Sequence, residues 1–430
     1  MSRLLPRLRS ARALAATVTA TLTVSTVTAL STVVAAPAQA AGSTAGGGPG
    51  LRPVVLVGNN WDGTIDVLTP GRWKNVARIN AIPDERERML EIATDPERLA
   101  YFNLIAIAIG EGNNQYVDDM YLTPDGRSIV VSRPSFADVV SLSLRTGEVE
   151  WRFAVDGQRS DHMAVSPDGT EVAVSASTGN VVHVLDIDTG REKWSFPSGD
   201  SPHENIYIND GKAILHASIG LVYTPADRDF GDATKGERQL QIVNTRTRRI
   251  RQMIDVRGAL DARGLDRVSN AVRPLTVSPN ERFLYFQLSF FHGFFEYDRR
   301  TDRITRVKRL PDLRPTTLRE EYVLDSAHHG IAMNPKGTRI CVAGTVSDYA
   351  TIVNRGSFKR GPLLKAGTKA YWATPSQNGR HCYVSWSGTD TVSKISYRTK
   401  RVVETTQVGD HPQRVRNGFM RKALFRQLRS

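Results

Sequence analysis

The sequence predicts an all-β protein built from one repeated unit, and three observations support this prediction. First, a short apolar strand ending in a tight turn recurs along the chain, most clearly as Ser160–Gly169 (SDHMAVSPDG). The fixed φ of proline and the positive φ open to glycine suit such turns. Second, the turn glycines Gly126, Gly169 and Gly211 are 43 and 42 residues apart. Third, the repeats contain strands alone, and all-strand repeats of roughly 40–45 residues are typical of propeller blades.

The number of copies predicts a seven-bladed β-propeller. The copies are Asp118–Gly126, Ser160–Gly169, His203–Gly211, Arg273–Asn280, His328–Gly337, Tyr371–Gly379 and a weaker one at His411–Gly418. The segment Val54–Leu68 predicts two further strands without a copy of the unit before them. The orphan strand at Gln413–Arg416 can supply the missing one, so we expect the ring to be closed by the N- and C-terminal strands. Such closure removes open sheet edges.

The ends of the chain differ from the repeats. Four arginines, an apolar run over 13–36 and the small residues Ala38 and Ala40 describe a Sec-type signal peptide. Serine and threonine interrupt the apolar run, so we expect no stable membrane span and a secreted protein. The expected domains are a signal peptide (1–41), a disordered linker (42–52), the seven-bladed propeller (53–418) and a basic C-terminal tail (419–430). The tail is expected to be either a helix on the propeller wall or disordered.

The charge indicates what kind of partner the protein has. The whole chain carries a formal +13, and loss of residues 1–41 removes four arginines and no acid, which leaves +9. A basic exported protein suits an acidic oligosaccharide or polysaccharide, or an anionic cell-wall polymer. Ordinary solubility explains the charge equally well. Nucleic acid fits poorly because the charge is scattered, and we expect a monomer.

The two cysteines, Cys341 and Cys382, occupy equivalent places in successive repeats. Export permits a disulfide. Equivalent positions in neighbouring blades usually lie beyond the roughly 7 Å Cα separation that a disulfide spans, which argues against one. The pairing therefore stays open, and a structural zinc site made of cysteines is excluded by their number.

Three insertions indicate which face carries function. They are Pro83–Ile109, whose segment 84–92 is charged and has a helical period, Tyr223–Arg238 and Pro311–Asp325. Each insertion follows the fourth or the second strand of a blade. In an antiparallel blade, the loops after these two strands open on the same face as the start of the first strand. The insertions would therefore surround a single funnel.

The residues that begin each repeated strand are predicted to line the mouth of this funnel. Almost every blade offers a titratable or hydrogen-bonding side chain there, although any one of them can be explained as a polar residue at a wet channel mouth. The candidate catalytic residues are His162, His203, Arg273, His329 and Tyr371. The candidate substrate-binding residues are Asp119, Glu204, Tyr223, His292, His328, Tyr349, Trp372 and Arg414.

Two kinds of chemistry are compatible with this set. The first is a cofactor-free acid–base site for an acidic sugar, in which Arg273 binds a uronate carboxylate, a histidine takes a proton and Tyr371 or another histidine supplies one. The second is a divalent metal site made by His162, His203 and His329 with Glu204 or Asp119. Side chains on non-adjacent blades are expected to lie too far apart for bonds of about 2 Å, so the metal-free site is preferred.

The strand pairs at Val54–Leu68 and Glu171–Asp186 and the turn Ser166–Gly169 resemble those of YVTN-type (WD40-like) seven-bladed propellers. This resemblance implies the fold over about 53–418 but no particular function, since propellers include enzymes such as lactonases, binding modules and scaffolds. The strands that begin with histidine or arginine are distantly similar to those of the propeller-fold rhamnose–glucuronate lyases. That resemblance implies a carbohydrate-active polysaccharide lyase that cleaves a glucuronate-containing glycan by β-elimination. The alternative is a non-catalytic propeller that binds a ligand or protein partner through the same face.

Overall fold

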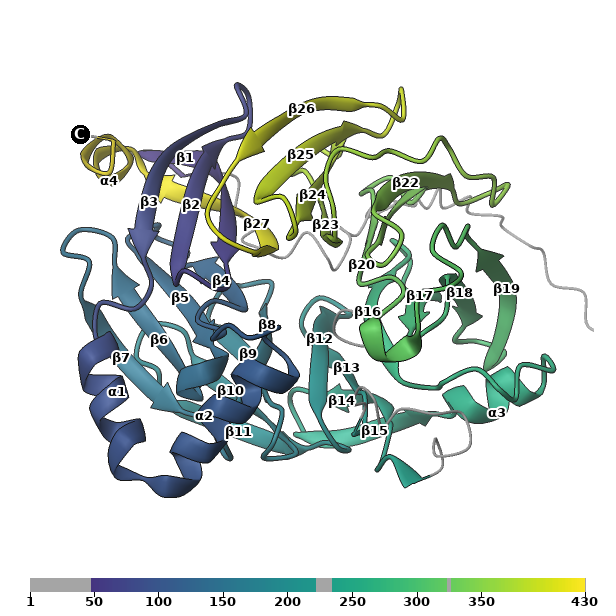
Figure 1. Ribbon diagram of the computed structural model, residues 1–430, viewed down its shortest axis with the longest axis horizontal. Helices are drawn as coiled ribbons and strands as arrows, with labels where there is room; N and C mark the ends of the chain where they lie inside the picture. Colours follow the sequence, from purple (N-terminus) through teal and green to yellow (C-terminus); the bar gives the residue numbers. More distant parts are fainter. Residues whose placement is uncertain (1–47, 222–233, 323–325, 430) are drawn as a thin grey trace, which may run out of the picture. The chain divides into compact units, whose positions relative to one another are not determined.

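The computed structural model describes residues 48–221, 234–322 and 326–429, which form seven antiparallel sheets (Figure 1). Within these residues, six sheets have four strands and one has three. We number the sheets as blades and give the strands of each in hydrogen-bonded order. The first three blades are β27 (Pro412–Arg421), β1 (Leu51–Asn59), β2 (Thr64–Thr69), β3 (Lys74–Asn80); β4 (Asp119–Leu122), β5 (Ser128–Arg133), β6 (Asp138–Ser143), β7 (Val149–Ala154); and β8 (Ser160–Val165), β9 (Glu171–Ala176), β10 (Val181–Asp186), β11 (Glu192–Pro197). The fourth to seventh blades are β12 (Pro202–Ile208), β13 (Ala213–Ser218), β14 (Leu240–Asn244), β15 (Arg249–Ile254); β16 (Val272–Val277), β17 (Phe283–Leu288), β18 (Gly293–Asp298), β19 (Arg303–Arg309); β20 (Gly330–Met333), β21 (Arg339–Gly344), β22 (Tyr349–Asn354); and β23 (Ala370–Pro375), β24 (His381–Trp386), β25 (Thr391–Ser396), β26 (Val402–Gln407). The predicted all-β, seven-bladed propeller is confirmed.

The first strands of the seven sheets form the inner wall of a closed ring. Each of β4, β8, β12, β16, β20 and β23 contacts the next along the chain, and β27 contacts both β23 and β4. Strand β27 pairs antiparallel with β1, with Val415 opposite Val57. One blade thus contains strands from both ends of the propeller, as the orphan strand predicted, and this pairing closes the ring.

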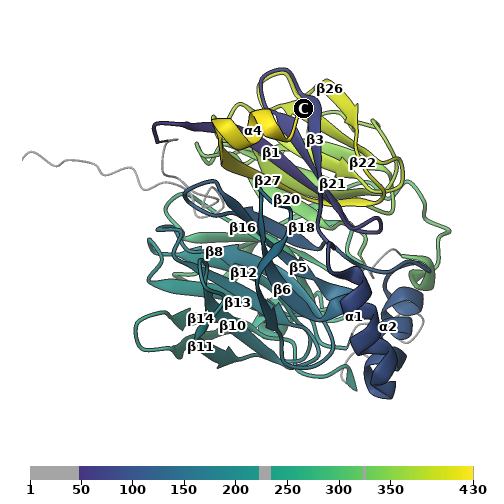
Figure 2. The same ribbon diagram turned by 90° about the vertical axis from the view of Figure 1, so that its left-hand side faces the viewer.

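The two ends of the propeller extend further than the sequence suggested. Strand β1 begins at Leu51, inside the expected linker, and pairs with Arg421, which lies inside the expected tail. Helix α4 (Lys422–Gln427) follows and packs beside β27 (Figure 2). Its Phe425 is buried, and the guanidinium of Arg52 lies 3.6 Å from the centre of that ring. The expected signal peptide, with most of the linker, lies outside the described residues.

The sixth blade is narrower than the others. Its three strands are followed by a segment that forms no fourth strand in the described residues and meets β22 at the isolated bridges Val353–Arg360 and Ala350–Leu364. Its inner strand also lies very close to the next blade. A Cβ on Gly330 would lie 2.7 Å from the backbone nitrogen of Ala373, so a larger residue would push β20 away from β23.

A disulfide joins Cys341 on β21 to Cys382 on β24. The expectation that neighbouring blades hold these residues too far apart is wrong, because their Cα atoms are 6.4 Å apart, within bridging range. The reason lies in the core between these two blades. Five of its twelve buried residues are alanines, among them Ala332, Ala343 and Ala373, and such small side chains allow the two sheets to approach closely.

Helices occur mainly in the connections. The segment after β3 forms α1 (Glu85–Thr94) and α2 (Pro96–Ala108), which pack side by side (Figures 1 and 2) and confirm the predicted helical period. Between them, the Asp95 carboxylate accepts hydrogen bonds from the backbone of Glu97 and Arg98 and caps α2. Elsewhere in the described residues the structure has α3 (Val256–Asp261), α4 and short 3₁₀ turns at 134–136 and 319–321. In the described part of the chain, none of the helices has the length and apolarity needed to cross a membrane.

Arg133 connects α1 to the second blade. Its fully buried guanidinium binds Asp138, also fully buried, and Asp84 at the start of α1. Burial raises the pKa of the Asp84 carboxyl, but the hydrogen bond and charge of Arg133, together with the charge of Arg88, hold that pKa below its ordinary value. The first insertion is therefore anchored by a buried ion pair.

Candidate active site in the central channel

The candidate residues lie where the inner strands are irregular. In β8, β12, β16 and β23, the pairing with the second strand of the blade skips two residues near the start of the strand. The skipped pairs are Asp161–His162, His203–Glu204, Arg273–Pro274 and Tyr371–Trp372. Bulges of this kind turn side chains out of the regular alternation and are over-represented beside active sites. Here the sheet irregularity directs polar side chains toward the channel.

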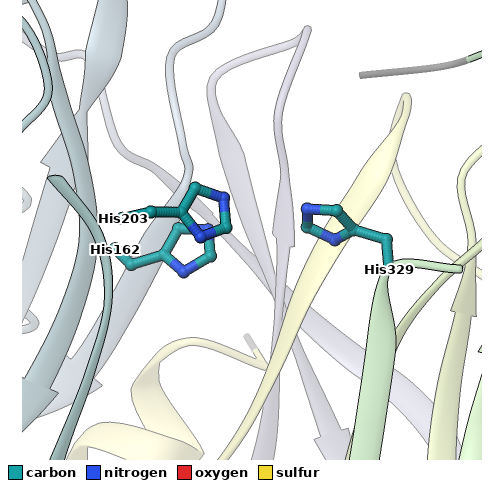
Figure 3. A group of neighbouring side chains, drawn as sticks. All are labelled: His162, His203 and His329. Carbon is teal, nitrogen blue, oxygen red and sulfur yellow. The ribbon is translucent and has the colours of Figure 1, made fainter. Parts of the chain in front are cut away.

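Three histidines from three blades meet in the channel, and we call His162, His203 and His329 the histidine triad (Figure 3). The rings of His162 and His203 lie beside one another with centres 3.8 Å apart, and His329 points toward them from the opposite side. The centre of the His329 ring is 6.2 Å from that of His162 and 5.9 Å from that of His203. One ring nitrogen of each lies within 4.8 Å of the other two. The expectation that non-adjacent blades keep these groups apart is wrong, because the side chains extend inward.

His162 is held by two carboxylates. A Glu204 oxygen lies 2.8 Å from His162 Nδ1, and an Asp161 oxygen lies 3.5 Å from Nε2. Asp161 also accepts hydrogen bonds from Arg159 and Ser177. Burial raises the pKa of Glu204 to about 8, against the opposing effect of nearby arginines. Burial, aided by Arg414 and the neighbouring histidines, keeps the pKa of His162 well below its ordinary value.

His329 and His203 have fewer partners. The His329 ring stacks on Tyr371 with centres 4.1 Å apart, and its Nε2 lies 3.4 Å from the tyrosine hydroxyl. Within the described residues, Nδ1 of His203 and Nδ1 of His329 are buried without a hydrogen-bond partner. Burial and nearby arginines lower the pKa of both imidazoles well below the ordinary value, and burial raises that of Tyr371.

Arginines lie beside the triad. Arg414 is fully buried, with its guanidinium 3.9 Å from the centre of the Trp372 ring and 3.4 Å from Asp118. Arg273 lies on β16, whose neighbours on the inner wall are β12 and β20, and it donates a hydrogen bond to Ser289. Its charge lowers the pKa of both His203 and His329. The channel therefore contains guanidinium groups together with the imidazoles of the triad and the phenol of Tyr371.

Carboxylates offset these arginines. Asp119 receives two hydrogen bonds from Arg416, at 2.8 and 2.6 Å. Asp118 and Asp161 form a second close group with His162. Burial raises the pKa of Asp118 to about 7, although Arg414 opposes the shift.

Some predicted residues form a separate group. His328 Nε2 lies 3.1 Å from the Tyr349 hydroxyl, and the His292 ring is 5.7 Å from that of His328. His292 in turn is 3.0 Å from the Tyr322 hydroxyl. These residues therefore contact one another in the sixth blade and its neighbour. Tyr223 lies outside the described residues.

Two cavities lie on the face where the inner strands begin. One, of about 410 Å³, is lined by Trp61, Arg314, Asp348, Thr368, Lys369, Ser387, Gly388, Asp390 and Asp410. The other, of about 250 Å³, is lined by Ser289, Phe290, Phe291, Arg319 and the segment 267–269. Insertion residues take part, since Arg314 belongs to one and Arg319 to the other. Lys369 also forms an ion pair with Glu111, just beyond α2.

Sequence reasoning missed several residues of this region. Arg416 lies two positions after Arg414 on the same strand, and the period of two could have indicated that both point to one side. Trp61 stacks on His411 with centres 3.8 Å apart and lines the larger cavity. Its position in a turn between β1 and β2 carries no comparable signal. Arg159 precedes β8 and is recognisable only from its contacts.

Comparison with known proteins gives one partial match. A family model described as outer membrane protein assembly factor BamB matches residues 123–254, less than a third of the chain. The matched segment runs from the end of β4 through β15 and includes His162 and His203, but neither Arg273 nor His329. No curated protein matches the sequence. The match supports the repeat fold of the second to fourth blades, whereas the part of the channel site that contains Arg273 and His329 lies outside its span.

Proposed function

We propose that this protein is an exported, carbohydrate-active enzyme that cleaves a glucuronate-bearing glycan by β-elimination. The observation that carries the proposal is the grouping of Arg414 and Tyr371 with the histidine triad, with Arg273 on the inner strand β16 between β12 and β20. The export signal and the basic charge predicted from the sequence agree with an acidic polysaccharide outside the cell.

The reaction needs three components, and the cluster contains each. Positive charge on the C6 carboxylate makes the C5 proton more acidic, and Arg273 and Arg414 supply guanidinium groups for it. An imidazole nitrogen of the triad takes the C5 proton. The C4–O bond then breaks, the electrons of the C5–H bond form the C4=C5 double bond, and the leaving oxygen takes a proton from Tyr371. No oxidant, reductant or water is consumed.

Aromatic and polar groups near the cluster suit a sugar. Trp372 lies against Arg414 in the channel, and Phe291 lines the smaller cavity beside Ser289, the partner of Arg273. Flat aromatic rings provide apolar contact for sugar rings, while carboxylates and amides bind hydroxyl groups. These groups support binding of a sugar on the insertion-bearing face.

The direct test is the ultraviolet absorbance of the unsaturated uronate product, with the full-length secreted protein and a panel of glucuronate-containing polysaccharides. We expect a rise that falls about 10²- to 10³-fold in Arg273→Ala, the loss typical for one positioned donor to a developing charge. The matched control is Arg127→Ala, which removes an exposed arginine and should leave the rate unchanged. No rise on any glycan refutes the proposal, as does equal loss in both variants.

A second candidate is a non-catalytic binding propeller. It rests on the partial match to a family described as an assembly factor and on exposed apolar residues on α2. Leu104 is 53% exposed and Ile107 is 77% exposed, and residues three apart on a helix lie on one face, so together they offer apolar surface to a partner protein. Under this candidate, Leu104→Glu with Ile107→Glu abolishes capture of a partner protein, whereas Arg273→Ala leaves it intact.

A further inference from the structure

We infer that the histidine triad binds one divalent transition-metal ion, with zinc as the best-matched species. Three neutral imidazoles with an open fourth position are a ligand set used by catalytic zinc sites. The inference concerns ion binding, which does not require the proposed elimination. Only the catalytic role of the ion rests on the proposed function.

Geometry is the first argument. One nitrogen of each triad member lies within 4.8 Å of the others. Zinc–nitrogen bonds of about 2.0–2.1 Å in a tetrahedral site place ligand nitrogens roughly 3.4 Å apart. Small rotations of the three side chains close this difference, because the rings already face one another across the channel (Figure 3).

The hydrogen-bonding pattern is the second argument. Buried ring nitrogens normally have partners, yet within the described residues Nδ1 of His203 and Nδ1 of His329 have none. His162 differs, because Glu204 occupies its Nδ1. A carboxylate on one nitrogen of a histidine orients the ring and directs the other nitrogen to a metal. Glu204 is therefore the expected supporting residue of the site.

The charge balance is the third argument. A divalent ion beside Arg273 and Arg414 needs nearby negative charge. Asp118 and Asp161 supply it, since both lie in close range of His162, and carboxylate oxygen is itself a zinc ligand. With the ion bound, none of the three imidazoles would be free to take the C5 proton. In the metal-loaded protein that role would fall to a carboxylate beside the triad such as Asp161, with Tyr371 still donating the proton to the leaving oxygen.

The test is metal binding by the full-length protein after treatment with a chelator. Zinc titration followed by calorimetry and elemental analysis should give one ion per chain. Cobalt(II) in its place should give the visible bands of a low-symmetry site. His203→Gln and His329→Gln should each weaken binding more than 100-fold, and Glu204→Gln about 10- to 100-fold, as for other supporting carboxylates.

The matched control is His328→Gln, which changes the buried histidine next to His329 but outside the triad. It should bind zinc like the wild type, and circular dichroism should show that every variant is folded. Absence of stoichiometric binding by folded wild type overturns the inference, and so does unchanged affinity in folded His203→Gln and His329→Gln. If the folded protein catalyses elimination but binds no zinc, the inferred metal site is refuted and the proposed function stands. If it binds zinc but cleaves no glycan, the proposed function is refuted and the metal site stands.

Discussion

Removal of the disulfide tests how the sixth and seventh blades are held together. The bond closes a loop with a sequence separation of 41 residues between Cys341 and Cys382. The chain-entropy treatment assigns a loop of this size about 4 kcal/mol of stabilisation at 25 °C, through restriction of the unfolded chain. For a fold of this size the unfolding entropy is roughly 0.8 kcal/mol/K, so the loss corresponds to a decrease in Tm of about 5 °C.

The assay is urea unfolding of the wild type and of Cys341→Ala with Cys382→Ala, followed by tryptophan fluorescence. The alanine core around both cysteines should keep the folded structure, since each change removes only one buried sulfur. Wild type with reductant is the control that separates loss of the bond from loss of the sulfur atoms. If the oxidised wild type and the double variant unfold at the same urea concentration, the bond does not constrain the unfolded chain and the reasoning is refuted.

Two further changes test the anchoring of the first insertion and the closure of the ring. Arg133→Ala leaves the carboxylate of Asp138 fully buried with less compensation and should lower the free energy of unfolding by about 3–5 kcal/mol, whereas Arg127→Ala on an exposed ion pair should cost less than about 1 kcal/mol. Chemical denaturation compares them, and equal effects would contradict the role of the buried pair. A chain ending at Asp410 lacks β27 and should show no cooperative thermal transition, because β1 then has an open edge. A chain ending at Arg421 lacks only α4 and should keep the transition, and cooperative melting of both would refute the closure argument.

The repeat architecture was accessible from sequence because its causes are local. Turn residues such as those at Ser166–Gly169 prescribe backbone angles, and alternating strands recur at a period that only stacked blades explain. The closure of the ring could also be predicted, because an unpaired strand near the C-terminus can complete the incomplete blade near the N-terminus. The identity of most channel residues followed from the same period, because each copy begins at the same height of the inner wall.

Other features depended on distances between blades. The disulfide forms because alanines such as Ala343 and Ala373 bring two sheets within 6.4 Å at the cysteine Cα atoms, and no local pattern reports how closely sheets pack. The grouping of His292 with His328 rather than with the triad likewise depends on side-chain direction.

The sequence by itself determined the class of fold and the number of blades, and it indicated several of the polar residues of the channel, because turn chemistry and strand alternation act over a few residues. Tertiary structure alone decided that His162, His203 and His329 meet, since bulges redirect two of them and the ring sets the distance to the third. Burial, which only the closed ring produces, then lowers the pKa of these imidazoles and raises that of Glu204. The amino-acid sequence indicates which chemical groups can form the channel site. The distances between these groups and their protonation states depend on packing among residues that are remote in sequence.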